Sequence, residues 1–474
     1  MGLNKYMKIV LLVLISLEVG AQSFYKVIGT SGNDYAEQVI NDRDSGYVVV
    51  GGTEGLGQGE MDGYMVKLDT AGNLQWTRTF GNENVDWLTS VVLLDDGMLA
   101  CGYSNVAGDY QMYLVRTNEI GQVVWERTIG NDNWEFPQEL TLVNDTTVVL
   151  VGEVYVAGST TTDALVASVS ISGDSLWYRT FGGADDDVLE RVITSDSGQV
   201  YVCGTYTVQQ DDTDYWVGRL DNSGDFIWEL FLGDTLNDEG HGIAELITGE
   251  FVVTGGDNDT TSTNLDNVFY KIDSNGNVLY QNILNNPNDD IGIDVVSYSD
   301  TNLFFLVSQS SSVGFGGFDT WVFDCNYYMW GIGDLSFSFG TLDDEWVTDA
   351  DTTFDRGIIT VGNMQDDVLG NVIFVHKTRA GEALLNTYDT EQDLEVADPI
   401  GSKTIFYPNP ISAGEIHWSQ KDRFLGSEYV IHDLQGKVVQ SGVVNSGSLT
   451  IDLKSGYYLL KIGEVVWNFS VIER

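Results

Sequence analysis

A repeat of about fifty residues constrains the fold of this chain more than any other feature. It occurs seven times between Phe24 and Asn386, and most copies share a turn glycine followed four residues later by an aromatic residue. The turn glycines are Gly72, Gly121, Gly173, Gly224, Gly276 and Gly381. The aromatic residues are Trp76, Trp125, Trp177, Trp228 and Tyr280. Short β-type segments in repeats of this length are typical of β-propellers, so we predict an all-β fold with seven four-stranded blades.

The unit at 29–81 shows how one blade is built. Polar and glycine-rich turns separate four strand-like segments at 36–42, 47–53, 64–69 and 73–81. The second segment, YVVVGGT, is nearly all apolar, which indicates burial on both faces of a sheet. The fourth segment carries the repeated tryptophan, and a packed aromatic side chain buries roughly 150–250 Å². We expect each tryptophan to lie between neighbouring blades.

Closure of the ring has two candidate strands. Seven copies of the first three strands are present, but eight segments qualify as a fourth strand. The segments at the two ends of the array are FYKVIG (24–29) and EALLNTYD (382–389). One of them must complete the seventh blade, because closure removes exposed sheet edges. FYKVIG ends in the glycine of the repeat and EALLNTYD does not, so the sequence favours the N-terminal segment.

The first 21 residues have the pattern of a secretory signal peptide. Lys5 and Lys8 precede the apolar run 9–16, and small residues precede a cleavage point between Ala21 and Gln22. An uncleaved anchor is the alternative, although the run is short for a membrane span. No later segment has the roughly 20 consecutive apolar residues that a membrane helix needs. We expect an exported protein without a transmembrane segment after cleavage.

Charge divides the chain near residue 401. The chain has 22 basic and 71 acidic residues, but 402–474 holds equal numbers of each, so the negative surplus lies in the repeats. The predicted organisation is a signal peptide at 1–21, a propeller at 22–390, a linker at 391–401 and a C-terminal domain at 402–474. So negative a surface repels nucleic acid and anionic lipid. It suits solubility in salty surroundings, divalent cations or cationic partners.

The sequence shows no recognisable catalytic set. Only four histidines occur, and none has metal-ligand spacing or a neighbouring nucleophile motif. Pairs of carboxylates are unavoidable in so acidic a chain and indicate nothing specific. Three cysteines, Cys101, Cys203 and Cys325, are too few for a disulfide framework, and we expect them to be buried apolar residues. No cofactor is predicted apart from the calcium considered next.

Two acidic positions recur in nearly every unit. The first follows the fourth strand, at Asp34, Asp86, Asp132, Asp186, Asp238, Asp290 and Asp344. The second opens the third strand, at Asp62, Asp109, Asp163, Asp214, Asp266, Asp319 and, as asparagine, Asn371. Both loops of a blade lie on one face, so this ring could bind Ca²⁺, which takes six to eight oxygen ligands, or a cationic partner. Alternatively, each carboxylate accepts hydrogen bonds from its own loop. A residue repeated in every blade usually serves the blade, which favours the second interpretation.

Two segments resemble known families. The unit at 177–206 is similar to bacterial β-propeller repeats, and that resemblance covers about 24–386. The tail resembles the C-terminal sorting domain of the type IX secretion system of Bacteroidetes, through FYPNP (406–410), VIHDLQGKVV (430–439), IDLKSGYYLLKI (451–462) and FSVIER (469–474). Its alternating segments predict a small β-sandwich. The resemblance implies passage through the periplasm and outer membrane, removal of the tail, and release or attachment at the cell surface.

The best interpretation of these features is an exported, non-catalytic propeller that binds or adheres at the cell surface. Its expected partners are the type IX secretion machinery, through 402–474, and an unknown surface glycan or protein. One alternative is a secreted polysaccharide hydrolase or lyase with carboxylates at the propeller axis, although a fold alone does not define an activity. Another is a surface protein whose structure calcium stabilises.

Overall fold

The computed structural model describes residues 23–378 except 131–132, 156–157, 210–211, 259–263, 285–287, 302, 315–316, 327–335, 342 and 367–368. It also describes 394–396, 406–407, 415–418, 424–433, 437–445, 448–451, 453–454, 456–462 and 465–471. The predicted signal peptide and its cleavage point therefore lie outside the described residues. The chain divides into two compact units, 1–397 and 398–474. Within the described part, no helix is long and apolar enough to cross a membrane.

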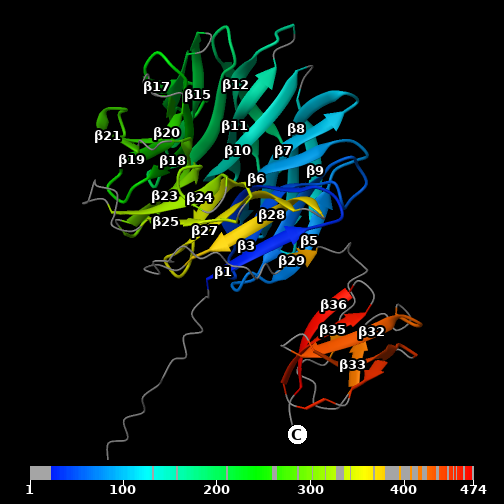
Figure 1. The fold of residues 1–474 in the computed structure, drawn as a ribbon. Coiled ribbons are helices and arrows are strands. Elements are labelled where there is room, and N and C mark those ends of the chain that lie inside the picture. Colours follow the sequence, from blue (N-terminus) through cyan, green and yellow to red (C-terminus); the bar gives the residue numbers. More distant parts are fainter. Residues whose placement is uncertain are drawn as a thin grey trace, which may run out of the picture. The chain divides into compact units, whose positions relative to one another are not determined.

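The first unit contains seven antiparallel sheets, each one blade of a propeller (Figure 1). The first, inner strands of blades 1 to 7 are β2 (Asp34–Asn41), β6 (Asp86–Leu94), β10 (Trp134–Asn144), β14 (Val188–Thr194), β18 (Asp238–Glu245), β22 (Asp290–Ser297) and β26 (Glu345–Thr352). The second strands are β3 (Tyr47–Thr53), β7 (Gly97–Val106), β11 (Thr147–Tyr155), β15 (Val200–Gln209), β19 (Phe251–Asn258), β23 (Leu303–Ser310) and β27 (Ile358–Asp366).

The outer half of each blade repeats in the same way. The third strands are β4 (Asp62–Leu68), β8 (Asp109–Asn118), β12 (Thr162–Ser170), β16 (Asp212–Leu220), β20 (Leu265–Ile272), β24 (Asp319–Asn326) and β28 (Gly370–Lys377). The fourth strands are β5 (Leu74–Phe80), β9 (Val123–Ile129), β13 (Ser175–Phe181), β17 (Phe226–Leu232), β21 (Val278–Leu284), β25 (Ser336–Phe339) and, in blade 7, β1 (Phe24–Gly29). The prediction of a propeller with seven four-stranded blades is confirmed.

The hydrophobic core consists of seven clusters, each shared by two neighbouring blades. The second strand supplies many of these side chains, and β3 is buried along its whole length, as its apolar sequence predicts. One cluster joins blade 1 to blade 7, with Val49 and Tyr64 beside Val361 and Val375. This shared core closes the ring. Cys101, Cys203 and Cys325 are buried and free, as expected.

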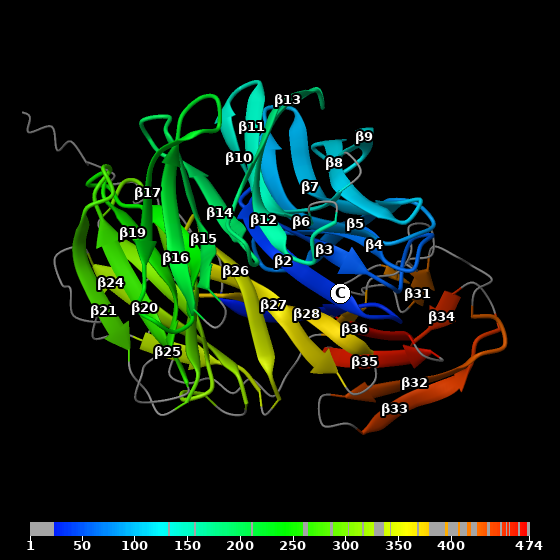
Figure 2. The same ribbon diagram turned by 90° about the horizontal axis from the view of Figure 1, so that it is seen from above.

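The N-terminal strand completes blade 7, as the sequence favoured. β1 pairs antiparallel with β28, so Phe24 lies opposite Lys377 and Ile28 opposite Ile373. Figures 1 and 2 show the yellow strands of blade 7 beside the blue strands from the start of the chain. A short strand that the sequence did not predict, β29 (Leu394–Val396), pairs parallel with the outer side of β1. The rival segment 382–389 lies outside the described residues.

The second unit is also built of β-strands. β30 (Phe406–Tyr407), β31 (Glu415–Trp418) and β34 (Ser448–Thr450) form one sheet. β32 (Glu428–Asp433), β33 (Val438–Val443), β35 (Gly456–Ile462) and β36 (Val465–Val471) form another. An apolar cluster takes Leu449 from the first sheet and Ile431, Leu460 and Ile462 from the second. The two sheets therefore share a core of their own.

Candidate functional site

Each inner strand contains a β-bulge at the same place, and the bulges form a ring at the propeller axis. A bulge adds a residue on one strand and turns the neighbouring side chain. We call the residues that follow the extra residue the axial ring. From blade 1 to blade 7 they are Gln38, Ser90, Glu139, Arg191, Gly242, Asp294 and Asp349. The sequence analysis did not identify this ring, because its members share a backbone position and no residue type.

Most members of the axial ring form a hydrogen bond to the backbone of the next blade. The side chain accepts a hydrogen bond from the backbone N–H that follows the ring position in the next blade. The bonds are Val91 to Gln38 (2.7 Å), Leu140 to Ser90 (3.2 Å), Val192 to Glu139 (2.7 Å), Ala350 to Asp294 (3.3 Å) and Val39 to Asp349 (2.9 Å). These N–H groups need acceptors because the inner strand has a sheet neighbour on one side only. The ring is thus mainly structural.

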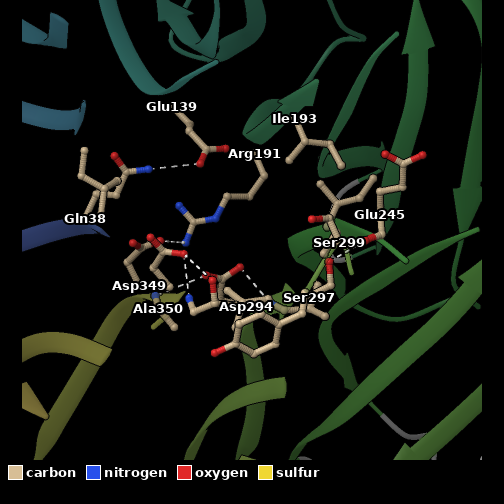
Figure 3. Close-up of a pocket in the computed structure, with 18 of the residues that line it drawn as sticks. Gln38, Glu139, Arg191, Ile193, Glu245, Asp294, Ser297, Ser299, Asp349 and Ala350 are labelled. Atoms are coloured by element: carbon tan, nitrogen blue, oxygen red, sulfur yellow. Dashed lines mark hydrogen bonds and ion pairs between the residues drawn. The ribbon is translucent and has the colours of Figure 1, made fainter. Parts of the chain in front are cut away.

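Arg191 and Gly242 break this pattern. The Arg191 guanidinium crosses the axis to blade 7, where Nη2 lies 3.2 Å from Asp349 Oδ1 and donates to the carbonyl of Thr348 (3.1 Å). Figure 3 shows Arg191 directed toward Asp349, with Glu139 on its other side. Gly242 has no side chain, and a β-carbon there would lie 2.8 Å from the α-carbon of Asp294. One cation therefore sits among several axial carboxylates.

A cavity of about 460 Å³ lies along the inner strands beside Arg191 (Figure 3). Glu139, Asp294 and Asp349 line it near the ring. Farther along the inner strands its lining is Asp196, Glu245, Asp351 and Tyr298. Arg191 is the only cation among these lining residues, so the ionisable groups of the cavity are almost all carboxyl groups. Their oxygens can accept hydrogen bonds from the hydroxyl groups of a ligand.

Burial shifts Glu139, Asp294, Asp349 and Asp351 of this cavity toward their neutral forms by raising their pKa values. It raises the pKa of Glu139 to about 7, although Arg191 and the Val192 N–H act in the opposite direction. Burial likewise raises the pKa values of Asp294 and Asp349 against the attraction of Arg191. It raises the pKa of Asp351 to about 6. A carboxyl group that keeps its proton near neutral pH can donate as well as accept hydrogen bonds.

An ion pair lies next to the ring, on the extra residues of two bulges. His241 Nδ1 of blade 5 is 2.7 Å from Glu190 Oε2 of blade 4, and His241 Nε2 is 3.4 Å from Glu239 Oε2. Burial lowers the pKa of His241, but the two glutamates outweigh it and raise the pKa to about 10. His241 is therefore a cation at neutral pH. The sequence analysis assigned no role to it.

Seven aromatic side chains form a second candidate site, which we call the aromatic platform. They are Tyr35, Trp87, Tyr103, Tyr110, Trp134, Phe136 and Tyr155. They form an unbroken chain of ring contacts over blades 1 to 3, with centroids 5.1 Å apart from Tyr35 to Trp87 and 6.1 Å apart from Trp134 to Tyr155. Trp134 is 42% exposed and Tyr155 38% exposed. The platform lies where inner strands begin and second strands end.

The predicted acidic ring is partly displaced in the structure. The buried acids at the starts of the inner strands are Asp34, Asp86, Glu135, Asp187, Asp238, Asp290 and Glu345. The predicted Asp186 and Asp344 are their exposed neighbours and accept N–H groups of Thr162 and Phe318, each at 2.8 Å. Asp132 lies outside the described residues. One-residue differences of this kind arise because the loops contain runs of two or three acids.

Several buried acids of this ring accept hydrogen bonds from the backbone N–H groups of their own loops. Asp34 accepts the N–H of Thr30 at 2.5 Å, and Asp86 that of Asn82 at 2.7 Å. In the same way, Asp187 accepts the N–H of Gly183 at 2.6 Å, Asp238 that of Asp234 at 2.8 Å and Glu345 that of Thr341 at 2.9 Å. No group of three or more His, Cys, Asp or Glu side chains among the described residues could hold a metal ion. Calcium binding stays a prediction.

The second acidic position was misplaced in two blades. Asp62 lies opposite Thr53 in the sheet of blade 1. The matching residue of blade 2 is Gln111, opposite Ser104, and that of blade 7 is Val372, opposite Met364. The predicted Asp109 and Asn371 are therefore not equivalent to Asp62. Asp109 is exposed beside Tyr110 of the aromatic platform.

These features define a seven-bladed β-propeller with an axial cavity, followed by a separate C-terminal β unit. No protein-family model matches the chain, and no curated protein matches its sequence. Its fold is similar to the WD40 domain of Neurospora crassa Pan2, with a TM-score of 0.45 and 11% identity over 73% of this chain and 89% of that one.

The chain is also similar to two further solved structures. PorZ, a surface component of the type IX secretion system of Porphyromonas gingivalis, matches with a TM-score of 0.36 and 11% identity over 90% of this chain and 58% of that one. The propeller domain of the Trilobed protease from Pyrococcus furiosus matches with a TM-score of 0.42 and 9% identity over 78% and 99%.

Proposed function

We propose that this chain is an exported, non-catalytic propeller that binds a glycan or protein at the cell surface through the aromatic platform. One observation carries the proposal. The platform is continuous over blades 1 to 3 and is absent from the matching positions of blades 4 to 6. Exposed clusters of large aromatic side chains are characteristic of binding surfaces.

The aromatic residues are not needed to build a blade. Tyr35, Trp87 and Phe136 each directly follow the buried acid at the start of the inner strand. Blade 7 has Trp346 at this position, but the matching residues of blades 4, 5 and 6 are Val188, Glu239 and Ile291, and those blades form the same sheets. A structural requirement would recur in each blade. The platform therefore has another purpose, for which we propose ligand contact.

We further propose that the C-terminal unit directs export through a type IX secretion system, to the outer-membrane surface or the medium by way of the periplasm. The resemblance of its motifs to sorting domains supports this, as does its separate core. The experiment is to delete 402–474 in a bacterium that has this secretion system and to locate the protein. We expect the shortened protein to stay in the periplasm. Its normal arrival at the surface would refute this part of the proposal.

Binding is tested with the full-length protein on an array of glycans and surface proteins. The test variant replaces Trp134 and Tyr155 with alanine. Both side chains are partly exposed, so the fold should be kept. The control is Phe354→Ala, because Phe354 is 63% exposed but lies in the turn after β26, at the other end of the strands. Loss of a specific ligand in the double variant alone supports the platform. If no glycan or protein on the array binds the full-length protein, the proposal is contradicted.

The axial cavity favours a second candidate function, cleavage of a polysaccharide as a hydrolase or a lyase. Its acids Glu139, Asp294 and Asp349 include groups that keep protons near neutral pH, which a general acid requires. Against this candidate, the same carboxylates hold neighbouring blades together. Measured turnover of a polysaccharide that Glu139→Gln abolishes, without loss of folding, would favour the enzyme over the binding module.

A further inference from the structure

The loops beside the aromatic platform contain acids and no bases. We call the surface formed by two sets of loops the loop face. One set joins each fourth strand to the next blade, and the other joins second to third strands. No lysine or arginine occurs in the sequence of any of these loops. Their exposed acids include Glu54, Glu60, Glu83, Asp186, Asp234, Asp343 and Asp344, and Asp109 is exposed at the start of β8. This face attracts cations and repels anions.

The basic side chains of the propeller are used elsewhere. At the opposite ends of the strands, Lys67 lies 2.8 Å from Asp42, and Lys377 lies 2.6 Å from Asp355. More exposed pairs join Arg127 to Asp174, Arg179 to Asp225 and Arg356 to Asp300. All of these acids lie in turns between first and second or third and fourth strands. The loop face therefore has no basic loop residue of its own to neutralise its acids.

Acids also lie within the aromatic platform. Trp87 Nε1 donates to Glu37 Oε1 at 3.0 Å. Glu153 lies opposite Phe136 in the sheet of blade 3, and Asp109 is exposed next to Tyr110. A cation that approaches these rings meets both the negative faces of the aromatic systems and the exposed carboxyl group of Asp109. A neutral sugar would use the rings but gain nothing from the charge.

We infer that the ligand of the aromatic platform is a basic polypeptide segment, rich in lysine and arginine. This inference rests on the proposed binding function and specifies its partner. The long apolar stems of lysine and arginine pack on aromatic rings while their charged ends reach carboxylates. The acidic loop face raises the association rate and restricts the partner to positive charge. Charge complementarity thus favours a basic protein over a neutral glycan.

The test measures binding of fluorescent probes to the full-length protein by anisotropy. The probes are a peptide of alternating lysine and arginine, peptides of equal length made of glutamine and serine or of glutamate, and a neutral gluco-oligosaccharide. We expect only the basic peptide to bind, more weakly as salt rises. Trp134→Ala with Tyr155→Ala should lower its affinity by about tenfold or more, as for aromatic residues at the centre of interfaces.

Two further variants distinguish the contribution of the aromatic rings to binding from that of the nearby negative charge. Asp109→Asn removes one exposed carboxylate and should weaken the basic peptide severalfold while reducing the effect of salt. Phe354→Ala should leave binding unchanged. Equal binding of the basic peptide by the parent and the double aromatic variant would show attraction to the acidic field alone and overturn the inference.

The remaining outcomes separate this inference from the function it specifies. A neutral oligosaccharide that binds the parent and not the double aromatic variant would leave the binding function intact and overturn the basic partner. Binding of no probe at low salt would overturn the basic partner too. The wider array then decides the binding function separately.

Discussion

The indole ring of Trp177 in blade 3 lies against Gly224 in blade 4, where a β-carbon would lie only 2.3 Å from the ring. The same contact joins Trp76 to Gly121, Trp125 to Gly173, Trp228 to Gly276 and, at the closure of the ring, Phe24 to Gly72. Gly224 has a φ of 81°, so its turn also needs the conformational freedom of glycine. The turn glycine and the aromatic residue that define the sequence repeat therefore contact each other across neighbouring blades.

Gly224→Ala should lower the free energy of unfolding by about 2 to 5 kcal/mol. The left-handed backbone costs about 1–2 kcal/mol with a side chain, and the collision with Trp177 adds about 1–3 kcal/mol. Gly249→Ala is the matched control, because Gly249 has a φ of 74° and nothing within 4 Å of the added carbon. It should show the backbone cost alone. Denaturant unfolding measures both, and equal losses would contradict a role for the tryptophan contact.

Closure by the N-terminal strand predicts a large effect of a small change near the start of the chain. Ile28 in β1 is fully buried in the core shared by blades 1 and 7. Ile28→Ala should cost about 2–5 kcal/mol, the usual range for such a cavity. Val124→Ala in the fourth strand of blade 2, where Val124 is 61% exposed, should change stability by less than about 0.5 kcal/mol. Thermal melting that Ile28→Ala leaves unchanged would reject this closure.

The axial acids predict that the protein is more stable at mildly acidic than at basic pH. The pKa of Glu139 is raised from 4.5 to about 7 by burial, so the folded state holds this proton more tightly than the unfolded state. The resulting stability is complete below about pH 4.5 and is lost as pH rises through about 7. Glu37 and Glu345, whose pKa values burial also raises to about 7, act in the same direction.

The measurement is the melting temperature at about pH 5.5 and about pH 8, where the linkage predicts a fall. Glu139→Gln removes one titrating group and keeps an oxygen for the Val192 N–H, so its melting temperature should fall less over the same interval. A parent protein that melts at the same or a higher temperature at the basic pH would refute the prediction.

Calcium provides a separate test of the acidic ring. Asp34, Asp86 and Asp238 accept N–H groups of their own loops, which gives their carboxylates a role without a metal. We expect the same melting temperature in EDTA and in excess calcium. Magnesium at equal ionic strength controls for general screening of charge. A rise specific to calcium would instead support the calcium-stabilised alternative, because a ligand that binds the folded state raises its stability.

Much of the fold could be predicted because its physical causes are local. The repeated spacing of a glycine and an aromatic residue, as in Gly121 and Trp125, predicts a turn followed by a fourth strand. The apolar run at 47–53 predicts a strand that is buried on both faces. The choice of 24–29 as the closing strand also followed from local sequence, since Gly29 ends it as other glycines end other fourth strands. β29 could not be foreseen, because its three residues carry no distinct pattern.

The candidate sites were harder to predict. Arg191 and Asp349 are far apart in the sequence, and each belongs to a bulge that no residue type announces. The aromatic platform follows the repeat only in part, since an aromatic residue directly follows the starting acid of the inner strand in blades 1 to 3 but not in blades 4 to 6. The recurring acids drew attention because they repeat, and repetition is the mark of a structural role.

By itself, the sequence determined that the chain folds into seven like sheets, because each unit encodes its own strands, turns and buried faces within about fifty residues. It also determined the uneven charge of the chain. Only the tertiary structure decided which side chains meet at the axis and which rings join across blades 1 to 3. Those contacts depend on the arrangement of the blades around the axis and on how the bulges of neighbouring inner strands meet there, and neither is a property of one unit alone.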